Sequence, residues 1–216
     1  MSNQACPLCK NIIEPIPYFE NKIRPFFQCL NCDLVFVPER CHLSKYEEKR
    51  IYDLHENIAS DSGYQKFISR LTTPLIKEIK QNSCGLDFGS GNSSAIPLLL
   101  KEKTNNISLY DKFYARNEDL LHKQYDFITC TEVFEHLKEP DKVIQQLLNC
   151  LNPGGIFAIM TKRVIDQQAF SNWHYKNDLT HIIFFSENTF NWIAKKFSLE
   201  LEIIDKDIVF LYKTPV

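Results

Sequence analysis

The stretch GLDFGSGNS, Gly85 to Ser93, constrains the fold of this chain more than any other segment. Residues 85–88 form a short apolar run after a polar break, which predicts a strand, and the three residues Gly89 to Gly91 predict a tight turn. Residues 92–94 can cap a helix over the apolar positions that follow. Glycine lets a ligand lie directly against the backbone, and the free amides of a helix N-terminus offer donors. The stretch therefore predicts a nucleotide-type pocket.

A second predicted strand, residues 107–111, ends in an acid about twenty residues after the glycine turn. From that position the carboxylate of Asp111 can accept hydrogen bonds from the hydroxyls of a ribose. Either a dinucleotide or an adenosine ligand would suit this geometry. Two details favour adenosine: Asp87 stands two residues before the first glycine, and Ser94 replaces the third glycine of a dinucleotide fingerprint.

Strands and helices alternate through the rest of the chain. The expected elements are a strand at 126–131, a helix at 140–151, a strand at 156–160, a helix at 186–197 and strands at 199–204 and 208–212. Strand and helix units in series predict a parallel sheet with helices on both faces. The last two strands predict a terminal antiparallel hairpin.

Four ordered motifs resemble those of class I S-adenosylmethionine-dependent methyltransferases, including the type 11 and type 23 groups. They are DFGSGNS at 87–93, LYD at 109–111, YDFITCTEVFEHL at 125–137 and LNPGGIFAIMT at 151–161. The resemblance covers Gly85 to the C-terminus. It implies an α/β, Rossmann-like fold: a seven-stranded, mostly parallel sheet with helices on both faces and a C-terminal antiparallel hairpin.

The same resemblance implies which residues bind the cofactor, S-adenosyl-L-methionine. They are Asp87, Phe88, Gly89, Ser90 and Gly91 around the methionyl group, Asp111 on the ribose, followed by Lys112, Phe113 at the edge of the adenine pocket, and Thr131 and Glu132 at the mouth of the fourth strand. One departure is the short interval of about fifteen residues between Asp111 and Asp126. The usual third strand is therefore expected to be abbreviated.

Two Cys-x-x-Cys pairs, Cys6 with Cys9 and Cys29 with Cys32, stand about nineteen residues apart near the N-terminus. This spacing is typical of a zinc ribbon that binds the metal through four thiolates. A closed set of four cysteines leaves no open coordination position, so the predicted zinc is structural. The other four cysteines lie at unrelated spacings and are expected to be small core residues.

Residues 161–185 hold Trp173, His174, Tyr175 and His181 within nine positions, after the fifth expected strand. Ligands bind at the carboxyl edge of such sheets, and in similar methyltransferases this region lines the acceptor pocket. His174, His181 and Tyr175 are therefore the catalytic candidates, either histidine as a base if the acceptor must lose a proton. In contrast, Glu135 and His136 lack the His-x-x-x-His spacing of helical zinc sites. We interpret them, with Glu132, as a helix start beside the pocket.

Three parts are expected: a zinc ribbon at 1–42, a helical linker or lid at 43–82 whose run Glu47 to Arg50 forms a solvated face, and a methyltransferase domain at 83–216. With 216 residues, 44% hydrophobic and 24% charged, the chain can bury one good core and a small appendage. It shows neither an apolar run of membrane-spanning length nor an N-terminal export signal, so we expect a cytoplasmic protein without a membrane partner.

The acceptor is left open by the sequence. Residues 1–50 carry seven Lys or Arg against six Asp or Glu, and a ribbon so close to neutral favours a small or medium-sized acceptor over nucleic acid. An RNA methyltransferase that recognises its substrate through the ribbon is the first alternative. A non-catalytic module, which binds the cofactor while the ribbon recruits a partner protein, is the second. The oligomeric state is also open.

Overall fold

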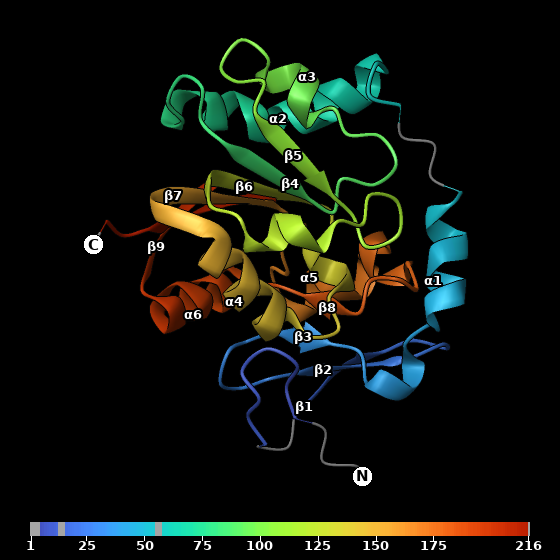
Figure 1. Cartoon of the computed structure of the whole chain (residues 1–216). Helices are drawn as coiled ribbons and strands as arrows, with labels where there is room; N and C mark the ends of the chain where they lie inside the picture. Colours follow the sequence, from blue (N-terminus) through green and yellow to red (C-terminus); the bar gives the residue numbers. More distant parts are fainter. Residues whose placement is uncertain (1–4, 13–15, 55–57, 216) are drawn as a thin grey trace.

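The structure is a computed structural model that describes residues 5–12, 16–54 and 58–215. Its larger sheet has six strands, the outermost on one side being β5 and on the other β9 (Figure 1). In spatial order they are β5 (Ile107–Tyr110), β4 (Gly85–Phe88), β6 (Tyr125–Thr131), β7 (Leu151–Met160), β10 (Ile208–Lys213) and β9 (Leu199–Asp205). The first four are parallel, and β10 runs antiparallel to both of its neighbours. The predicted parallel sheet and terminal hairpin are confirmed.

Helices cover both faces of this sheet, as the alternation of strands and helices predicted. One face packs against α2 (Ser62–Glu78) and the short α3 (Ile96–Leu100), and the other against α4 (Pro140–Cys150) and α6 (Glu187–Phe197) (Figure 1). Successive strand residues point to opposite faces. In β7, Ala158 and Met160 accordingly belong to the apolar cluster of α2 and α3, whereas Phe157 and Ile159 belong to that of α4 and α6.

The number of strands predicted for the sheet, seven, was wrong. In the described part of the chain, β5 is an edge strand, and the segment that follows it forms a bridge between Asp111 and Ala115 and then a 3-10 helix, Glu118–His122. A further parallel strand needs a crossover of about a dozen residues on each side. The interval between β5 and β6 is too short to supply both crossovers.

The N-terminal region forms a second, antiparallel sheet with a strand from the far end of the chain. Its order is β1 (Ile16–Glu20), β2 (Pro25–Gln28), β3 (Val35–Phe36) and β8 (Ile183–Phe184). β3 pairs directly with β8, and Phe26 packs on Phe184 with a centroid distance of 5.8 Å. The ribbon therefore shares a sheet and an apolar core with the segment that contains β8, although the division at residue 42 stays a prediction.

The helix after the ribbon, α1 (Lys45–Tyr52), begins at Ser44, which forms a capping box with Glu47. Glu48 lies on this helix but is only 6% exposed, so the predicted solvated face is wrong at this position. The reason is a tertiary ion pair: the Nζ of Lys112 donates to Glu48 at 2.6 Å. Figure 1 shows α1 beside the carboxyl ends of β4 and β5. Among the described residues, no helix is long and apolar enough to span a bilayer.

Candidate functional site

The glycine turn follows β4 as predicted and has a left-handed backbone at two positions, Gly89 with φ +80° and Gly91 with φ +64°. The amide of Gly89 donates to the carbonyl of Tyr110 at 2.7 Å, which holds the turn against the end of β5. A Cβ on Gly89 would lie 2.3 Å from Val133, whereas a Cβ on Gly91 would meet no atom within 4 Å. Gly89 is thus required by packing, and Gly91 presents bare backbone to open space.

Asp87 lies beneath this turn and is 3% exposed. Its carboxylate accepts hydrogen bonds from Ser94 and Thr129, both at 2.7 Å. Burial raises the pKa of Asp87, and the two hydroxyl donors oppose that shift. The structure therefore gives Asp87 a supporting place that joins the turn to β6. Phe88 stacks on Tyr110 with a centroid distance of 5.2 Å, and Ser90 is buried in the turn.

Asp111 stands at the end of β5, twenty residues from Gly91 in sequence and in contact with it in space. Its Oδ2 accepts from the amide of Gly91 at 3.1 Å, and its Oδ1 accepts from the amides of Phe113 and Tyr114 at 2.7 and 3.1 Å. A carboxylate offers about four lone-pair positions. Within the described chain one position on Oδ2 therefore remains for a ligand hydroxyl.

Lys112 and Phe113, predicted as cofactor-binding residues after Asp111, connect this edge to α1. Lys112 forms the ion pair with Glu48, and the ring of Phe113 packs on Tyr52 with a centroid distance of 5.8 Å. Tyr52 in turn lies edge-on to His136 at 5.3 Å. These contacts place α1 as a cover between the end of β5 and the end of β6.

At the end of β6, Thr131 and Glu132 face the same region. The Oγ1 of Thr131 and the Oε1 of Glu132 are buried and have no hydrogen-bond partner among the described residues. Glu132 adopts φ +53°, an unfavourable backbone for a residue with a side chain. Burial, and then the nearby Glu135, raise the pKa of Glu132 to about 8. Orphaned polar atoms beside an open glycine backbone fit a bound polar ligand.

Of the three catalytic candidates, the structure brings Tyr175 to Glu132 and Glu135 and brings His181 to Glu135, but leaves His174 exposed. The Tyr175 hydroxyl donates to Glu135 and lies 3.2 Å from the Oε2 of Glu132. The backbone carbonyl of Tyr175 accepts from the Nδ1 of His181 at 2.8 Å. The role predicted for His174 stays a prediction.

Glu135 was expected from the sequence to be part of a helix start and was given no functional role. It is fully buried, and its second oxygen accepts from the hydroxyl of Thr161 at 2.9 Å. The segment that holds it is a 3-10 turn, Phe134–His136, and the next helix begins only at Pro140, so the interpretation of this segment as a helix start is not supported. The sequence signal for a polar site at this position is the two acids and the histidine of EVFEH, residues 132–136.

A cavity of about 640 Å³ adjoins this group at the carboxyl end of β7. Its walls include Trp173, Lys162 and Arg163, together with Asp33 of the ribbon. The Nζ of Lys162 lies 5.0 Å from the centre of the Tyr175 ring, and Trp173 packs on the same ring. The walls carry one tryptophan and equal numbers of basic and acidic side chains (Lys162, Arg163 and Lys206; Asp33, Glu187 and Asp207), and a cavity of this size can hold a small polar organic molecule.

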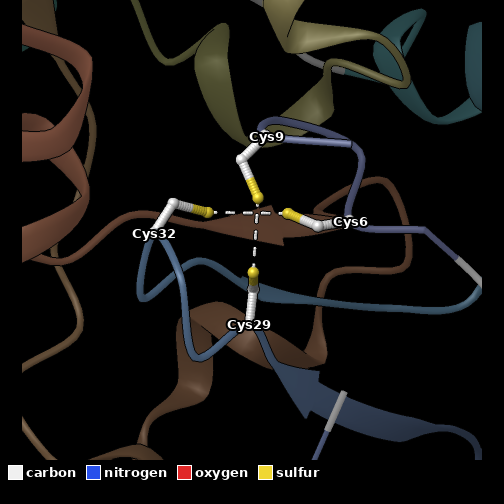
Figure 2. A group of neighbouring side chains, drawn as sticks. All are labelled: Cys6, Cys9, Cys29 and Cys32. Atoms are coloured by element: carbon white, nitrogen blue, oxygen red, sulfur yellow. Dashed lines mark hydrogen bonds between the residues drawn. The ribbon is translucent and has the colours of Figure 1, made fainter. Parts of the chain in front are cut away.

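The four predicted metal ligands converge in the ribbon (Figure 2). Their Sγ atoms all lie within 4.8 Å of one another, with Cys6 to Cys32 and Cys9 to Cys29 both at 3.5 Å. A tetrahedral zinc ion with zinc–sulfur distances of about 2.3 Å holds its sulfurs about 3.8 Å apart. The cluster therefore fits the ion.

The two Cys-x-x-Cys turns have the same local backbone structure, which presents the cysteines of each pair in the same way. In each, the residue after the second cysteine, Lys10 or Asp33, has a left-handed backbone with φ about +60°. The backbone amide of each of these residues donates to the carbonyl of the first cysteine of its pair, at 3.0 Å for Lys10 to Cys6 and 2.8 Å for Asp33 to Cys29.

Comparisons with known proteins agree with this geometry. The profile of a family described as a methyltransferase domain matches residues 60–202. A ubiquinone biosynthesis O-methyltransferase of Erwinia tasmaniensis is 31% identical over 74 residues, which are 34% of this chain and 30% of that protein. The chain thus spans about a third of the length of the curated relatives that it matches.

Two solved structures show the same fold. The complex of the Haloferax volcanii Trm112 methyltransferase activator with a methyltransferase aligns with TM-score 0.53 and 12% identity, over 73% of this chain and 96% of that one. The plantazolicin methyltransferase BpumL, in complex with SAH, aligns with TM-score 0.52 and 14% identity, over 79% of this chain and 90% of that one. Together with the family profile over two thirds of the sequence, these likenesses show that the chain belongs to the class I S-adenosylmethionine-dependent methyltransferase family.

Proposed function

We propose that this protein transfers a methyl group from S-adenosyl-L-methionine to a small or medium-sized acceptor. The observation that carries the proposal is the cradle formed by Gly89, Gly91 and Asp111, which opens beside Glu132 and Tyr175 at one edge of the sheet. The bare backbone at Gly91 would receive the methionyl group, and the free position on Asp111 Oδ2 would accept a ribose hydroxyl.

The proposed acceptor end is the cavity beside Trp173 and Tyr175. Methyl transfer from a sulfonium is an in-line displacement, so its barrier falls mainly through the positioning of donor and acceptor. The ring of Trp173 and the cation of Lys162, which lies over the ring of Tyr175, would orient a flat, polar organic molecule. The likeness to ubiquinone biosynthesis O-methyltransferases and the nearly neutral ribbon both support a small acceptor over RNA.

Zinc is proposed for the ribbon, bound by Cys6, Cys9, Cys29 and Cys32. With all four ligands supplied by thiolates, its role is to hold the ribbon together rather than to take part in the chemistry. This assignment is independent of the cofactor pocket, because the four sulfurs belong to the second sheet region.

Calorimetric titration of the zinc-loaded protein with S-adenosylhomocysteine tests the cofactor proposal. The wild type should bind one equivalent, and Asp111→Ala should weaken binding at least tenfold, because the substitution removes both the ribose acceptor and the anchor of the Gly91 amide. Glu102→Ala, an exposed acid after α3, is the matched control and should bind as the wild type does. A folded wild type that binds no product would refute the proposal and favour the non-catalytic alternative.

Alanine substitutions in the glycine turn should separate packing from ligand binding. Gly91→Ala should cost about 1 kcal/mol of stability, from its left-handed backbone alone, yet weaken S-adenosylhomocysteine binding strongly because the new methyl group enters the cradle. Gly89→Ala adds an overlap with Val133 and should cost on the order of 3 kcal/mol. Urea denaturation and calorimetry measure the two effects. Equal stability losses in the two variants would contradict this reading of the turn.

A further inference from the structure

A second group of metal-ligating side chains lies apart from the ribbon, at the carboxyl end of β6. One ligand atom each from Glu135, His136 and His181 can be chosen so that all three lie within 4.8 Å of one another. Glu135 and His136 belong to the 3-10 turn after β6, and His181 precedes β8. The amide of Ile182 donates to the carbonyl of Glu135 at 2.8 Å, so the backbone itself fixes the two segments together.

Both imidazoles use Nδ1 for a backbone hydrogen bond, which leaves Nε2 available as a ligand. The Nδ1 of His136 lies 2.9 Å from the carbonyl of Thr180, and the Nδ1 of His181 lies 2.8 Å from the carbonyl of Tyr175. A carbonyl can only accept, so each Nδ1 carries the proton and each Nε2 keeps its lone pair. This hydrogen bond from the second nitrogen is how metal-binding histidines are usually held.

The distances within the group also suit a metal ion. The centroids of the two imidazole rings are 4.8 Å apart, and the Nε2 of His136 lies 4.0 Å from the Oε1 of Glu135. Ligand atoms around one divalent ion, at bond lengths of about 2.1 Å, lie about 3.0 to 4.2 Å apart. Small side-chain rotations would bring this group onto an ion.

Charge in this region favours a cation. Glu132 and Glu135 share the Tyr175 hydroxyl, and the Oε1 of Glu132 is buried without a partner among the described residues. In the same described part of the chain, no ion pair joins either carboxylate to a lysine or arginine. Two buried carboxylates side by side are costly unless a proton or a cation compensates them, and a divalent ion can compensate both at once.

We infer that Glu135, His136 and His181 bind a divalent first-row transition-metal ion beside the cofactor cradle. Mixed imidazole and carboxylate ligands suit Mn²⁺, Fe²⁺, Co²⁺ or Zn²⁺, in contrast to the four thiolates of the ribbon. Val133 packs on Gly89 and stands between Glu132 and the 3-10 turn, so the metal site and the cradle are direct neighbours.

This position indicates an acceptor oxygen as the metal's substrate ligand, an extension that rests on the proposed function. A hydroxyl bound to the ion has a lowered pKa and loses its proton to water. The oxygen then forms a bond to the methyl carbon, the bond from that carbon to the sulfonium sulfur breaks, and its electron pair stays on sulfur as the neutral thioether. The structure thus favours O-methylation over N- or C-methylation.

Manganese titration tests the site without interference from the ribbon. Protein loaded with one zinc per chain and freed of other metals is titrated with Mn²⁺, and the electron paramagnetic resonance signal of free Mn²⁺ reports binding. The wild type should bind one Mn²⁺ per chain. His181→Asn and Glu135→Gln should weaken binding at least tenfold, whereas His122→Asn, an exposed histidine, should leave it unchanged. Zinc content and thermal unfolding confirm that each variant is folded.

Two results would overturn the inference: no saturable Mn²⁺ site in the folded, zinc-loaded wild type, or unchanged affinity in folded His181→Asn. The wild-type titration decides the question even where a variant fails to fold. Titration with S-adenosylhomocysteine on the same samples keeps the two proposals apart. Product binding without Mn²⁺ binding would refute the metal site alone, and Mn²⁺ binding without product binding would refute the cofactor proposal alone.

Discussion

Replacement of Cys32 by serine is expected to unfold the ribbon and, with it, the acceptor region of the methyltransferase domain. A structural zinc contributes on the order of 10 kcal/mol to folding a small domain, and three thiolates hold it far less tightly than four. The ribbon also carries part of the main core. Phe26 packs on Phe170 and Phe184 at 5.2 and 5.8 Å, and β3 supplies the partner strand of β8.

The loss of structure should not extend to the far face of the six-stranded sheet. The apolar cluster of α2 and α3 draws on the opposite face and contains no residue of the described ribbon. Hydrogen exchange should therefore accelerate at residues 164–186 in Cys32→Ser, or after zinc chelation, while β4 and α2 stay protected. Cys84→Ser is the matched control, because Cys84 lies outside the cluster of four. Unchanged protection at 164–186 would show that the ribbon is an independent appendage.

The glycine turn and the cluster of four cysteines were predictable because their signals are local. Two Cys-x-x-Cys pairs indicate converging thiols through spacing alone, and Gly89 and Gly91 indicate a turn through the backbone that only glycine adopts easily. Asp111 follows from its distance to that turn. In each case the residues that act together lie in one turn, or at the ends of neighbouring parallel strands.

The surroundings of Glu135 and Glu48 were harder to predict because their contacts join distant segments. The sequence places Glu135 and His181 46 positions apart, and only the fold makes them neighbours. Glu48 belongs to a charged run whose usual meaning is a solvated face, yet its partner Lys112 follows β5. The third strand is a further case. The short interval after Asp111 predicted that this strand would be abbreviated, but only the structure shows that, among the described residues, it is absent and β5 is an edge strand.

Arg24→Ala should be the most damaging single substitution of a charged residue in the ribbon. The side chain is 2% exposed, and its guanidinium donates to the carbonyls of Lys176, Asp178 and Leu179 at 2.7, 2.6 and 3.1 Å. Burial lowers the pKa of Arg24 to about 10, which still leaves it charged at neutral pH. Alanine would leave three buried carbonyls without a hydrogen-bond donor, which should lower the free energy of unfolding by on the order of 3 to 5 kcal/mol.

The functional consequence should exceed that of lost stability alone, because those carbonyls belong to the turn that leads into His181. Urea denaturation should show the loss in Arg24→Ala, a smaller loss in Arg24→Lys, which keeps the charge but not the three-way geometry, and none in Arg40→Ala, an exposed arginine of the same region. In folded Arg24→Lys, Mn²⁺ binding should weaken while S-adenosylhomocysteine binding persists, since Gly91 and Asp111 lie on other elements. If Arg24→Ala proved as stable as Arg40→Ala, the ribbon could not be what positions His181.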